Sequence, residues 1–459
     1  MSIFNQGKSF YRSMLAIAVP VALTNLLQNS VGLMDTFMVS TLGDEAVSAI
    51  AGANKFFFIF TLILFGIASG ASVMAAQYWG KQDVKAIEKI VGIVLRYSLI
   101  VGAVFGLAAF VLAKPVMLVF SNDPEVIRLG VGYLRIIALT FVADSFSVAL
   151  CLFLRSIEKT GIGLISQIIA CVLNFALNSI FIFGLVGAPK MGVNGAALGT
   201  LISRCVCLAV VVIYLKYFNK SIKLRPRYII HADRALSRDF FKYAGIVVIN
   251  ETLWGVGFSM HAAIFGHIST TAMTAASVVL TIQNMITIIS FGSANAAGVL
   301  VGMEVGKGDF KRAKERSQLF LIFSVGLGLI CTLFQMLARA YFVDFAVAKG
   351  MFNLEPQTVV LIKDMLLVMS IIVPIQAMNC HIIVGILRSG GDTKYATFCD
   401  VFFMWMLVLP AACICAFLLH WNPIYIFMVL YSEEILKCIA SAIRMLGWKW
   451  MKNVTREAA

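Results

Sequence analysis

Long apolar runs alternate with short polar connections along almost the whole chain, a pattern typical of proteins with many membrane-spanning helices. A helical span needs about 20 mostly apolar residues. The runs are far longer than the alternating segments of a membrane β-barrel. Several contain Gly or Pro, which helices in lipid tolerate when neighbouring groups satisfy the freed carbonyl. The pattern predicts twelve helical spans, at residues 14–39, 46–78, 90–113, 127–153, 161–184, 192–217, 241–268, 272–304, 318–338, 358–387, 395–418 and 423–446.

Short motifs recur between the first and second halves of the chain. Gly80-Lys81-Gln82-Asp83 returns in the second half as Gly306-Lys307-Gly308-Asp309, again between two apolar runs. Leu154-Arg155-Ser156 returns as Leu387-Arg388-Ser389. Related halves that both lie in membrane are typical of transporters built from repeats.

These patterns predict an all-α integral membrane protein with twelve transmembrane helices in two six-helix lobes. Six spans per half is an even number, so both halves have the same orientation and are expected to be related by a pseudo-twofold axis along the membrane normal. We predict an N-terminal lobe over residues 1–218, a basic cytoplasmic linker over 219–238, and a C-terminal lobe over 239–459.

Composition and charge agree with a membrane protein. The chain is 60% hydrophobic and 13% charged, with a mean hydropathy of +0.92. Its net charge of +14 does not indicate nucleic acid, because the basic residues lie between apolar runs rather than in one patch. Most of the 37 lysines and arginines fall in alternate connections. This asymmetry predicts a multi-pass protein of the plasma (inner) membrane with both termini cytoplasmic. The ten cysteines lack the spacing of a disulfide framework or zinc cluster.

The first span carries a polar stripe that ends in an acid. Gln28 and Asn29 follow Asn25 by three and four residues, so they share one helix face with it, which Asp35 continues. A charge at mid-bilayer costs at least ~2.5 kcal/mol, so it needs a reason. Pro20 is expected to bend this helix. The stripe and the proline favour a role for Asp35 as an acid that faces a cavity. The alternative is that Asp35 is a polar cap near the outer end of the span.

The seventh span carries an acid among aromatic residues. Glu251, Trp254, Phe258 and His261 lie on one helix face. A carboxylate beside aromatic rings suits a flat cationic guest, since the acid supplies charge and the rings supply cation–π contact. The alternative is a protonated, buried carboxylic acid that is hydrogen-bonded to another helix. His261 by itself is more typical of a structural histidine.

Other polar residues at membrane depth are ambiguous, because hydrogen bonds between helices, worth about 0.6 kcal/mol each, would also explain them. Asp144 and Asp400 are stronger candidates for a coupling network, because they can be charged. For Asp400, pairing with a nearby Lys or Arg is an equal alternative. Glu434 and Lys437 are predicted to form a structural i,i+3 pair. Candidate residues for a substrate cavity, besides those of the first and seventh spans, are Asn174, Asn178, Gln283, Thr287, Gln376 and Asn379.

Several motifs resemble those of the multidrug and toxic compound extrusion (MATE) family, and together they extend over nearly the whole chain. They are the run from Val31 to Met38 around Asp35, followed by Leu42-Gly43; the repeated Gly-Lys-x-Asp turn; Asn174-x3-Asn178 leading to Phe181-Ile182-Phe183-Gly184; and Leu387-Arg388-Ser389-Gly390-Gly391-Asp392-Thr393-Lys394. The chain looks closer to the NorM-type branch.

The resemblance implies a transporter that exports organic cations and amphipathic compounds, driven by inward flow of Na⁺ or H⁺. Its coupling acids carry over onto Asp35 and Glu251, either of which could hold Na⁺. Two departures qualify this. Asn178 stands where one branch has an aspartate, and Ala377 lies near the place of an acid in the NorM-type branch, which Asp364 does not obviously replace.

We expect no cofactor other than the coupling ion, H⁺ or Na⁺, and no metal site other than one for Na⁺ at Asp35 or Glu251. The expected partners are small cationic or amphipathic molecules and the lipid bilayer, with the protein a monomer. The sequence leaves open the coupling ion, the substrates, and whether Asp144, Asp364 or Asp400 takes part in coupling. The alternative is a flippase for lipid-linked oligosaccharides, which would want an arginine-lined cavity, whereas Arg135 and Arg204 are among few deep arginines here. An enzyme is not expected, because the five histidines are scattered and form no HExxH motif.

Overall fold

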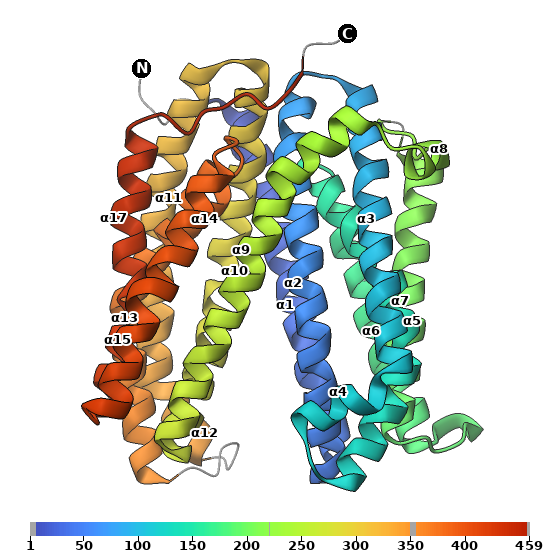
Figure 1. Ribbon diagram of the computed structural model, residues 1–459, viewed down its shortest axis with the longest axis vertical. Helices are drawn as coiled ribbons and strands as arrows, with labels where there is room; N and C mark the ends of the chain where they lie inside the picture. Colours follow the sequence, from blue (N-terminus) through green and yellow to red (C-terminus); the bar gives the residue numbers. More distant parts are fainter. Residues whose placement is uncertain (1–5, 220, 349–354, 457–459) are drawn as a thin grey trace. The chain divides into compact units, whose positions relative to one another are not determined.

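The computed structural model describes residues 6–219, 221–348 and 355–456, and the regular structure in these ranges is helical (Figure 1). The long helices are α1 (Lys8–Ser40), α2 (Asp44–Gly80), α3 (Val84–Val111), α5 (Pro124–Ser156), α6 (Gly161–Phe183), α7 (Val193–Ile213), α9 (Arg234–Ile268), α10 (Thr270–Lys307), α11 (Phe310–Leu337) and α13 (Pro356–Asn379). Shorter elements are α4 (Ala113–Phe120), η1 (Leu185–Gly187), η2 (Tyr214–Phe218), α8 (Pro226–Ile230), η3 (Ala338–Phe342), α12 (Val343–Ala348), η4 (Cys380–Leu387), α14 (Thr393–Phe402), η5 (Phe403–Val408), α15 (Leu409–Cys413), η6 (Ile414–Leu418), α16 (Pro423–Tyr431) and α17 (Glu433–Leu446).

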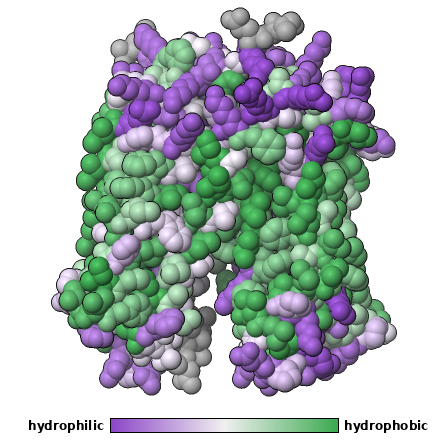
Figure 2. All heavy atoms as spheres, in the orientation of Figure 1, coloured by the Kyte–Doolittle hydropathy of each residue, from purple (hydrophilic) through white to green (hydrophobic). Residues whose placement is uncertain are grey.

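Ten helical segments of the described chain are long and apolar enough to cross a membrane, and they coincide with ten of the predicted spans. The other two predicted spans are also helical. Helix α9 has Asn250, Glu251 and His261 along its apolar length, and the last span is divided at Ser432 into α16 and α17. Apolar side chains cover much of the visible sides of the helices, and hydrophilic ones gather near the helix ends (Figure 2). The predicted all-α membrane fold is confirmed.

The repeated Gly-Lys-x-Asp turn joins two helices in the same way in both halves. The residue before the aspartate has a left-handed backbone, with φ of 62° at Gln82 and 78° at Gly308. The aspartate then caps the next helix, since Asp83 accepts from the Ala86 amide at 3.0 Å and Asp309 from the Arg312 amide at 3.0 Å. The motif therefore recurs because it ends one long helix and begins the next.

The chain divides into two compact units. The N-terminal unit is Leu23–Val248, and the C-terminal unit is Ile249–Ala459 together with Met1–Ala22. In the N-terminal unit, α5 packs against α2, α3 and α7, around a group of phenylalanines that includes Phe60 and Phe141, whose ring centroids are 4.9 Å apart. In the C-terminal unit, α10, α11, α13 and η4 pack together.

The two unit boundaries pass through α1 and α9 at equivalent places, because Ala22 and Val248 are separated along the chain by the same interval as the two copies of the Gly-Lys-x-Asp turn. The contacts that bind these helix ends are also equivalent. Within the N-terminal unit, Gly66 of α2 lies against Val248 of α9. Within the C-terminal unit, Gly292 of α10, which is the repeat equivalent of Gly66, lies against Ala22 of α1. The internal repeat is therefore visible in packing as well as in sequence.

These units differ from the predicted lobes at two places. Of the described residues, 6–22 belong to the C-terminal unit, and 219 and 221–248 belong to the N-terminal unit. The segment predicted as a linker contains α8 and the start of α9, and it is anchored on α3. Arg225 pairs with Glu88 at 3.0 Å, and Lys89 pairs with Asp233 at 2.9 Å. The division into lobes at 218 and 239 stays a prediction, as does the cytoplasmic location of this segment.

Candidate functional site

Asp35 of α1 lies in a polar cluster of the N-terminal unit. Asn178 of α6 donates from Nδ2 to Asp35 Oδ1 at 2.6 Å, and also to Asn174 Oδ1 at 3.3 Å. Asn174 in turn donates from Nδ2 to Thr200 Oγ1 of α7 at 3.2 Å. Both asparagines are buried. Three helices thus bring together three residues that the sequence marked as candidates, with the acid at the end of an amide chain.

The Asp35 carboxylate has no ion-pair partner among the described residues, and its hydrogen-bond donor is a neutral amide. A hydrogen bond from an amide favours the ionised acid without neutralising its charge. The charge of Asp35 is therefore not compensated by a base within ion-pair distance in the described part of the chain.

Asp144, by contrast, has a basic partner in the same unit. Its Oδ1 lies 3.6 Å from Arg204 Nε, and the side chains of Asp144 and Arg204 are 5% and 21% exposed. A buried acid with a partner of opposite charge is already compensated. This arrangement favours a structural role for Asp144.

The rest of the polar stripe on α1 is more open. Asn25 is half-buried, and Gln28 and Asn29 are exposed. Helix α1 continues through Pro20 without interruption. The bend predicted at Pro20 and the cavity predicted along the stripe both stay predictions.

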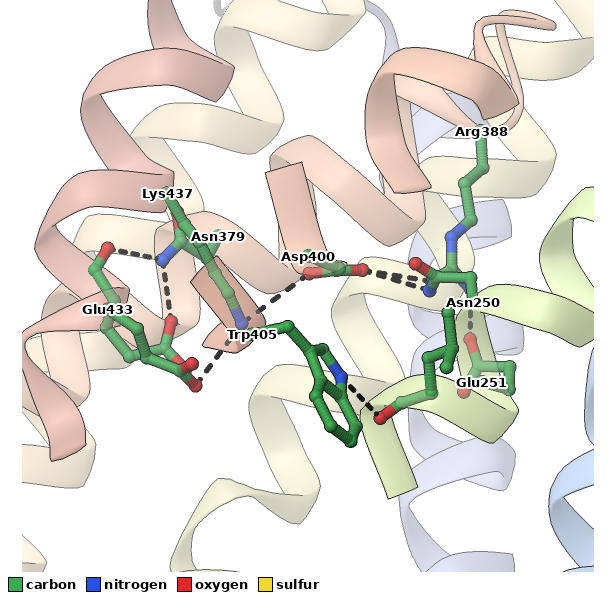
Figure 3. A network of polar contacts seen from close by, with 10 residues as sticks. Asn250, Glu251, Asn379, Arg388, Asp400, Trp405, Glu433 and Lys437 are labelled. Carbon is green, nitrogen blue, oxygen red and sulfur yellow. Dashed lines mark hydrogen bonds and ion pairs between the residues drawn. The ribbon is translucent and has the colours of Figure 1, made fainter. Parts of the chain in front are cut away.

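Glu251 of α9 lies in a second polar cluster, within the C-terminal unit (Figure 3). Arg388, just after η4, reaches it with Nη1 2.6 Å from Glu251 Oε1. The other arm of Arg388 lies 3.4 Å from Asp400 Oδ2 on α14, which also accepts from Asn250 Nδ2 at 3.1 Å. The sequence predicted an acid that awaits a cationic guest between aromatic rings. In this structure its cationic partner is Arg388.

The cluster extends from Asp400 to α17 through a lysine. Lys437 Nζ lies 3.7 Å from Asp400 Oδ1 and 3.3 Å from Glu433 Oε1. Glu434 Oε2 accepts from Asn379 Nδ2 of α13 at 2.6 Å. The predicted Glu434–Lys437 pair is thus wrong. Lys437 pairs with Glu433 one turn earlier, while Glu434 points to the neighbouring helix.

The aromatic residues of α9 pack as the spacing predicted. The Trp254 and Phe258 rings stack with centroids 5.4 Å apart, and Phe258 contacts His261 at 5.8 Å. His261 is 3% exposed and also lies against the Tyr431 ring, and neither of its ring nitrogens has a hydrogen-bond partner in the described part of the chain.

The remaining candidates of the C-terminal unit form contacts between helices. Gln335 donates to Gln283 at 2.7 Å, and Gln283 donates to Gln376 at 2.5 Å, which links α11, α10 and α13. The Thr287 hydroxyl donates to the Gln283 backbone carbonyl at 2.9 Å. Asp364 lies exposed on α13. Within residues 6–219, 221–348 and 355–456, no three His, Cys, Asp or Glu residues gather where they could hold a metal ion.

Sequence reasoning missed two members of the second cluster, Arg388 and Asn250. Arg388 stood in a recognised repeat motif, Leu387-Arg388-Ser389, but that motif was used only as a mark of duplication. A buried arginine costs free energy unless acids compensate it, so its depth between two apolar runs was the signal that could have paired it with Glu251.

Comparison with known proteins agrees with this architecture. The MatE family model matches residues 20–180 and 246–412, so it matches once in each half of the chain. The probable multidrug resistance protein YoeA of Bacillus subtilis is 25% identical over 413 residues, which cover 88% of this chain and 86% of that protein. The probable multidrug resistance protein NorM of Rhizobium meliloti is 25% identical over 342 residues, 71% of this chain and 70% of that protein.

Solved structures are similar in fold. The eukaryotic MATE transporter AtDTX14 superposes with a TM-score of 0.83 at 18% identity, over 97% of each chain. A mutant of the Vibrio cholerae MATE transporter VcmN gives 0.86 at 15% identity, over 97% of this chain and 98% of that one. These findings define a multi-pass membrane transporter with the twelve-helix, two-lobe fold, and not an enzyme. The chain belongs to the MATE family, whose members include multidrug efflux transporters.

Proposed function

We propose that this protein exports organic cations or amphipathic drugs by antiport with H⁺ or Na⁺, with Asp35 as the first coupling acid and Glu251 as the second. The observation that carries the proposal is the state of Asp35. Its carboxylate lies among helices with an amide as donor, and in the described ranges no base lies within ion-pair distance of it, since the nearby Arg204 pairs with Asp144. Such a group can exchange one cation for another, whereas an acid in a tight ion pair must first lose its partner.

In this proposal each ionised acid attracts a cationic substrate, and binding of the coupling ion removes that attraction. The protein alternates access between the two sides of the membrane, and the difference in affinity between the two states links the flows. The membrane potential contributes about 2.3 kcal/mol per elementary charge per 100 mV to inward movement of the coupling cation. The polar candidates within each unit are proposed substrate contacts.

The stacked rings of Trp254 and Phe258 support a flat, cationic or amphipathic substrate, because aromatic faces bind cations and apolar rings without a fixed hydrogen-bond geometry. The names of curated relatives such as YoeA and NorM, described as probable multidrug resistance proteins, point to the same class. We further propose that the protein works in the plasma (inner) membrane as a monomer, with both termini in the cytoplasm.

The test uses purified protein in proteoliposomes that contain ethidium, with either a pH gradient or a Na⁺ gradient imposed. Efflux under one gradient identifies the coupling ion. Asp35→Asn and Glu251→Gln are each expected to remove gradient-driven efflux. Efflux under neither gradient, or full transport by the double variant, would overturn the proposal.

A further inference from the structure

The second cluster contains more acids than bases. It is a series of ion pairs that runs from Glu251 through Arg388, Asp400 and Lys437 to Glu433 (Figure 3). Glu434 is the next residue on α17 and accepts from Asn379. The paired side chains are buried, from 3% exposed at Lys437 to 12% at Asp400. Four carboxyls thus share two bases. If all were ionised, the cluster would have a surplus of negative charge, and buried charge without compensation costs several kcal/mol.

The surplus falls on α17, at Glu433 and Glu434. The Glu434 carboxylate accepts a hydrogen bond from the neutral Asn379 amide, and no base lies within ion-pair distance of it in the described ranges. Glu433 is 4% exposed, and its Oε2 atom is buried with no hydrogen-bond partner in these ranges. The Oδ1 atom of Asn379 is likewise buried and lacks a donor. Two buried acceptors without donors, next to a surplus of negative charge, indicate a missing proton.

We propose that Glu433 and Glu434 form a proton-binding site that controls the availability of Glu251 through the ion-pair chain. This inference rests on the proposed function, since it assigns a further site to the coupling ion. Protonation forms one O–H bond on a carboxyl with a proton from the aqueous phase, and no other bond breaks. The acids and bases alternate along a chain rather than surround one point, an arrangement that suits a proton better than Na⁺, which needs several oxygens around it.

The series of ion pairs can transmit the protonation state of Glu433 and Glu434 to Glu251. With Glu433 ionised, the Lys437 ammonium is drawn towards Glu433, and Asp400 is left to Arg388. Glu251 then shares its arginine with a second acid and is freer to bind a cationic substrate. With Glu433 protonated, Lys437 turns to Asp400, and Arg388 stays on Glu251. Proton binding on α17 therefore opposes substrate binding at Glu251, and by linkage substrate binding releases protons.

Other titratable groups lie close to the cluster, and their proton uptake must be distinguished from that of Glu433 and Glu434. Besides the members of the chain, they are His261 on α9, Cys380 on η4, Cys399 on α14, Tyr431 on α16 and Cys438 on α17. Thiols and phenols ordinarily ionise above neutral pH, so between pH 5 and about 7.5 they stay protonated. Histidine ordinarily titrates within that range, so His261 needs its own control.

The experiment counts protons released when purified protein in weakly buffered detergent solution binds ethidium. A pH indicator reports the protons, and fluorescence anisotropy reports the bound dye. Wild type is expected to release protons, and Glu433→Gln and Glu434→Gln are each expected to release fewer per dye bound. Glu434→Asp, which keeps a carboxyl, is expected to restore the release. Glu355→Gln, an exposed acid at the start of α13, is the matched control and is expected to match wild type.

Two further measurements keep the inference separate from the proposed function and from misfolding. The first of these titrates dye-free protein from pH 8 to pH 5 and counts the protons taken up. Wild type is expected to take up more protons than the Glu433→Gln/Glu434→Gln double variant. The same difference is expected when both proteins also carry His261→Gln. This comparison needs no dye binding. Asn379→Leu removes no acid and deletes the amide that donates to Glu434, so it is expected to change proton release while the number of acids stays the same. Equal proton counts in wild type and the double variant, in both assays, would overturn the inference. Wild type that binds no dye, with unequal titrations, would count against the proposed function alone.

Discussion

Asn178 Nδ2 donates to Asp35 Oδ1 over 2.6 Å, so the acid of α1 is positioned by a neutral amide of α6. The amide orients the carboxylate and leaves its charge available. An asparagine at position 35 would keep a carbonyl oxygen that can accept the same hydrogen bond, but it could not bind or release a proton. The geometry thus separates the structural role of this side chain from its charge.

Asp35→Asn is therefore expected to fold like wild type and to lose gradient-driven efflux by an order of magnitude or more. The measurement is ethidium efflux from proteoliposomes, with thermal unfolding in detergent as the check on folding. Glu45→Gln, at an exposed acid in the first turn of α2, is the matched control and is expected to transport normally. Efflux by Asp35→Asn at the wild-type rate would show that this charge has no part in coupling.

The Arg388–Glu251 pair allows a prediction about stability. Arg388→Met leaves Glu251 and Asp400 buried without their shared base, and removal of one partner of a buried ion pair costs about 3–5 kcal/mol. Glu251→Gln is expected to cost less, because glutamine can still accept the hydrogen bond from Arg388 and Asp400 still compensates the arginine. Thermal unfolding in detergent measures both. A double variant, Glu251→Gln/Arg388→Met, should recover part of the loss, and additive effects would argue against the pair.

Close helix packing in the N-terminal unit gives a prediction with a built-in control. Gly66 and Gly70 form a GxxxG pair on α2, and a Cβ at Gly70 would overlap the backbone of Ala244 on α9. Gly70→Ala is therefore expected to lower the unfolding temperature. Gly245, the next residue on α9 after Ala244, has nothing within 4 Å of a Cβ. Gly245→Ala is expected to be neutral or stabilising by up to ~1 kcal/mol, through helix propensity alone. The same response to both substitutions would contradict the close approach.

Hydrophobic pattern and repetition were sufficient to predict the helices and the duplication, because lipid requires long apolar runs and the repeat preserves its turns. The pairing of charges was not predictable in the same way. Glu251 and Arg388 are 137 residues apart, and no periodicity reports such a contact. On α17, Lys437 is four residues from Glu433 and three from Glu434, so both spacings allow a pair. Only the position of Asn379 on α13 determines which acid turns away.

The division of α1 and α9 between units was also outside the reach of the sequence. The polar segment 219–238 indicated a linker, and the natural inference was that each half packs with itself. The contact of Gly292 with Ala22 places the start of α1 in the C-terminal unit. The contact of Gly66 with Val248 places the start of α9 in the N-terminal unit. The signal was present as small residues at positions 66 and 292, since only Gly permits such close approach of two helix backbones.

Asp233 connects the segment before α9 to the membrane helices. Its Oδ1 atom accepts from the Ala235 and Leu236 amides at 3.0 and 3.2 Å and so caps α9, and its Oδ2 atom pairs with Lys89 at 2.9 Å. The hydrogen bond from the Lys89 ammonium holds the pKa of Asp233 below its usual range. Because the folded-state pKa is lowered, the stabilising contribution is complete above the ordinary value of about 4 and is lost as pH falls through the lowered pKa. Anchoring of this segment should therefore be constant from pH 5 to 8 and weaken only in acid.

Two substitutions separate the cap from the charge. Asp233→Asn keeps a good N-cap but loses the ion pair, and is expected to remove the acid-dependent step with little change in protection at pH 7. Asp233→Ala also loses the cap, which is worth about 0.5–2 kcal/mol, so it should increase exchange at the start of α9 at every pH. Hydrogen exchange of residues 226–238, followed by mass spectrometry between pH 3 and 8, measures both effects. An acid-dependent step that persists in Asp233→Asn would show that another group anchors the segment. Equal exchange in Asp233→Ala and wild type would show that the cap does not stabilise the start of α9.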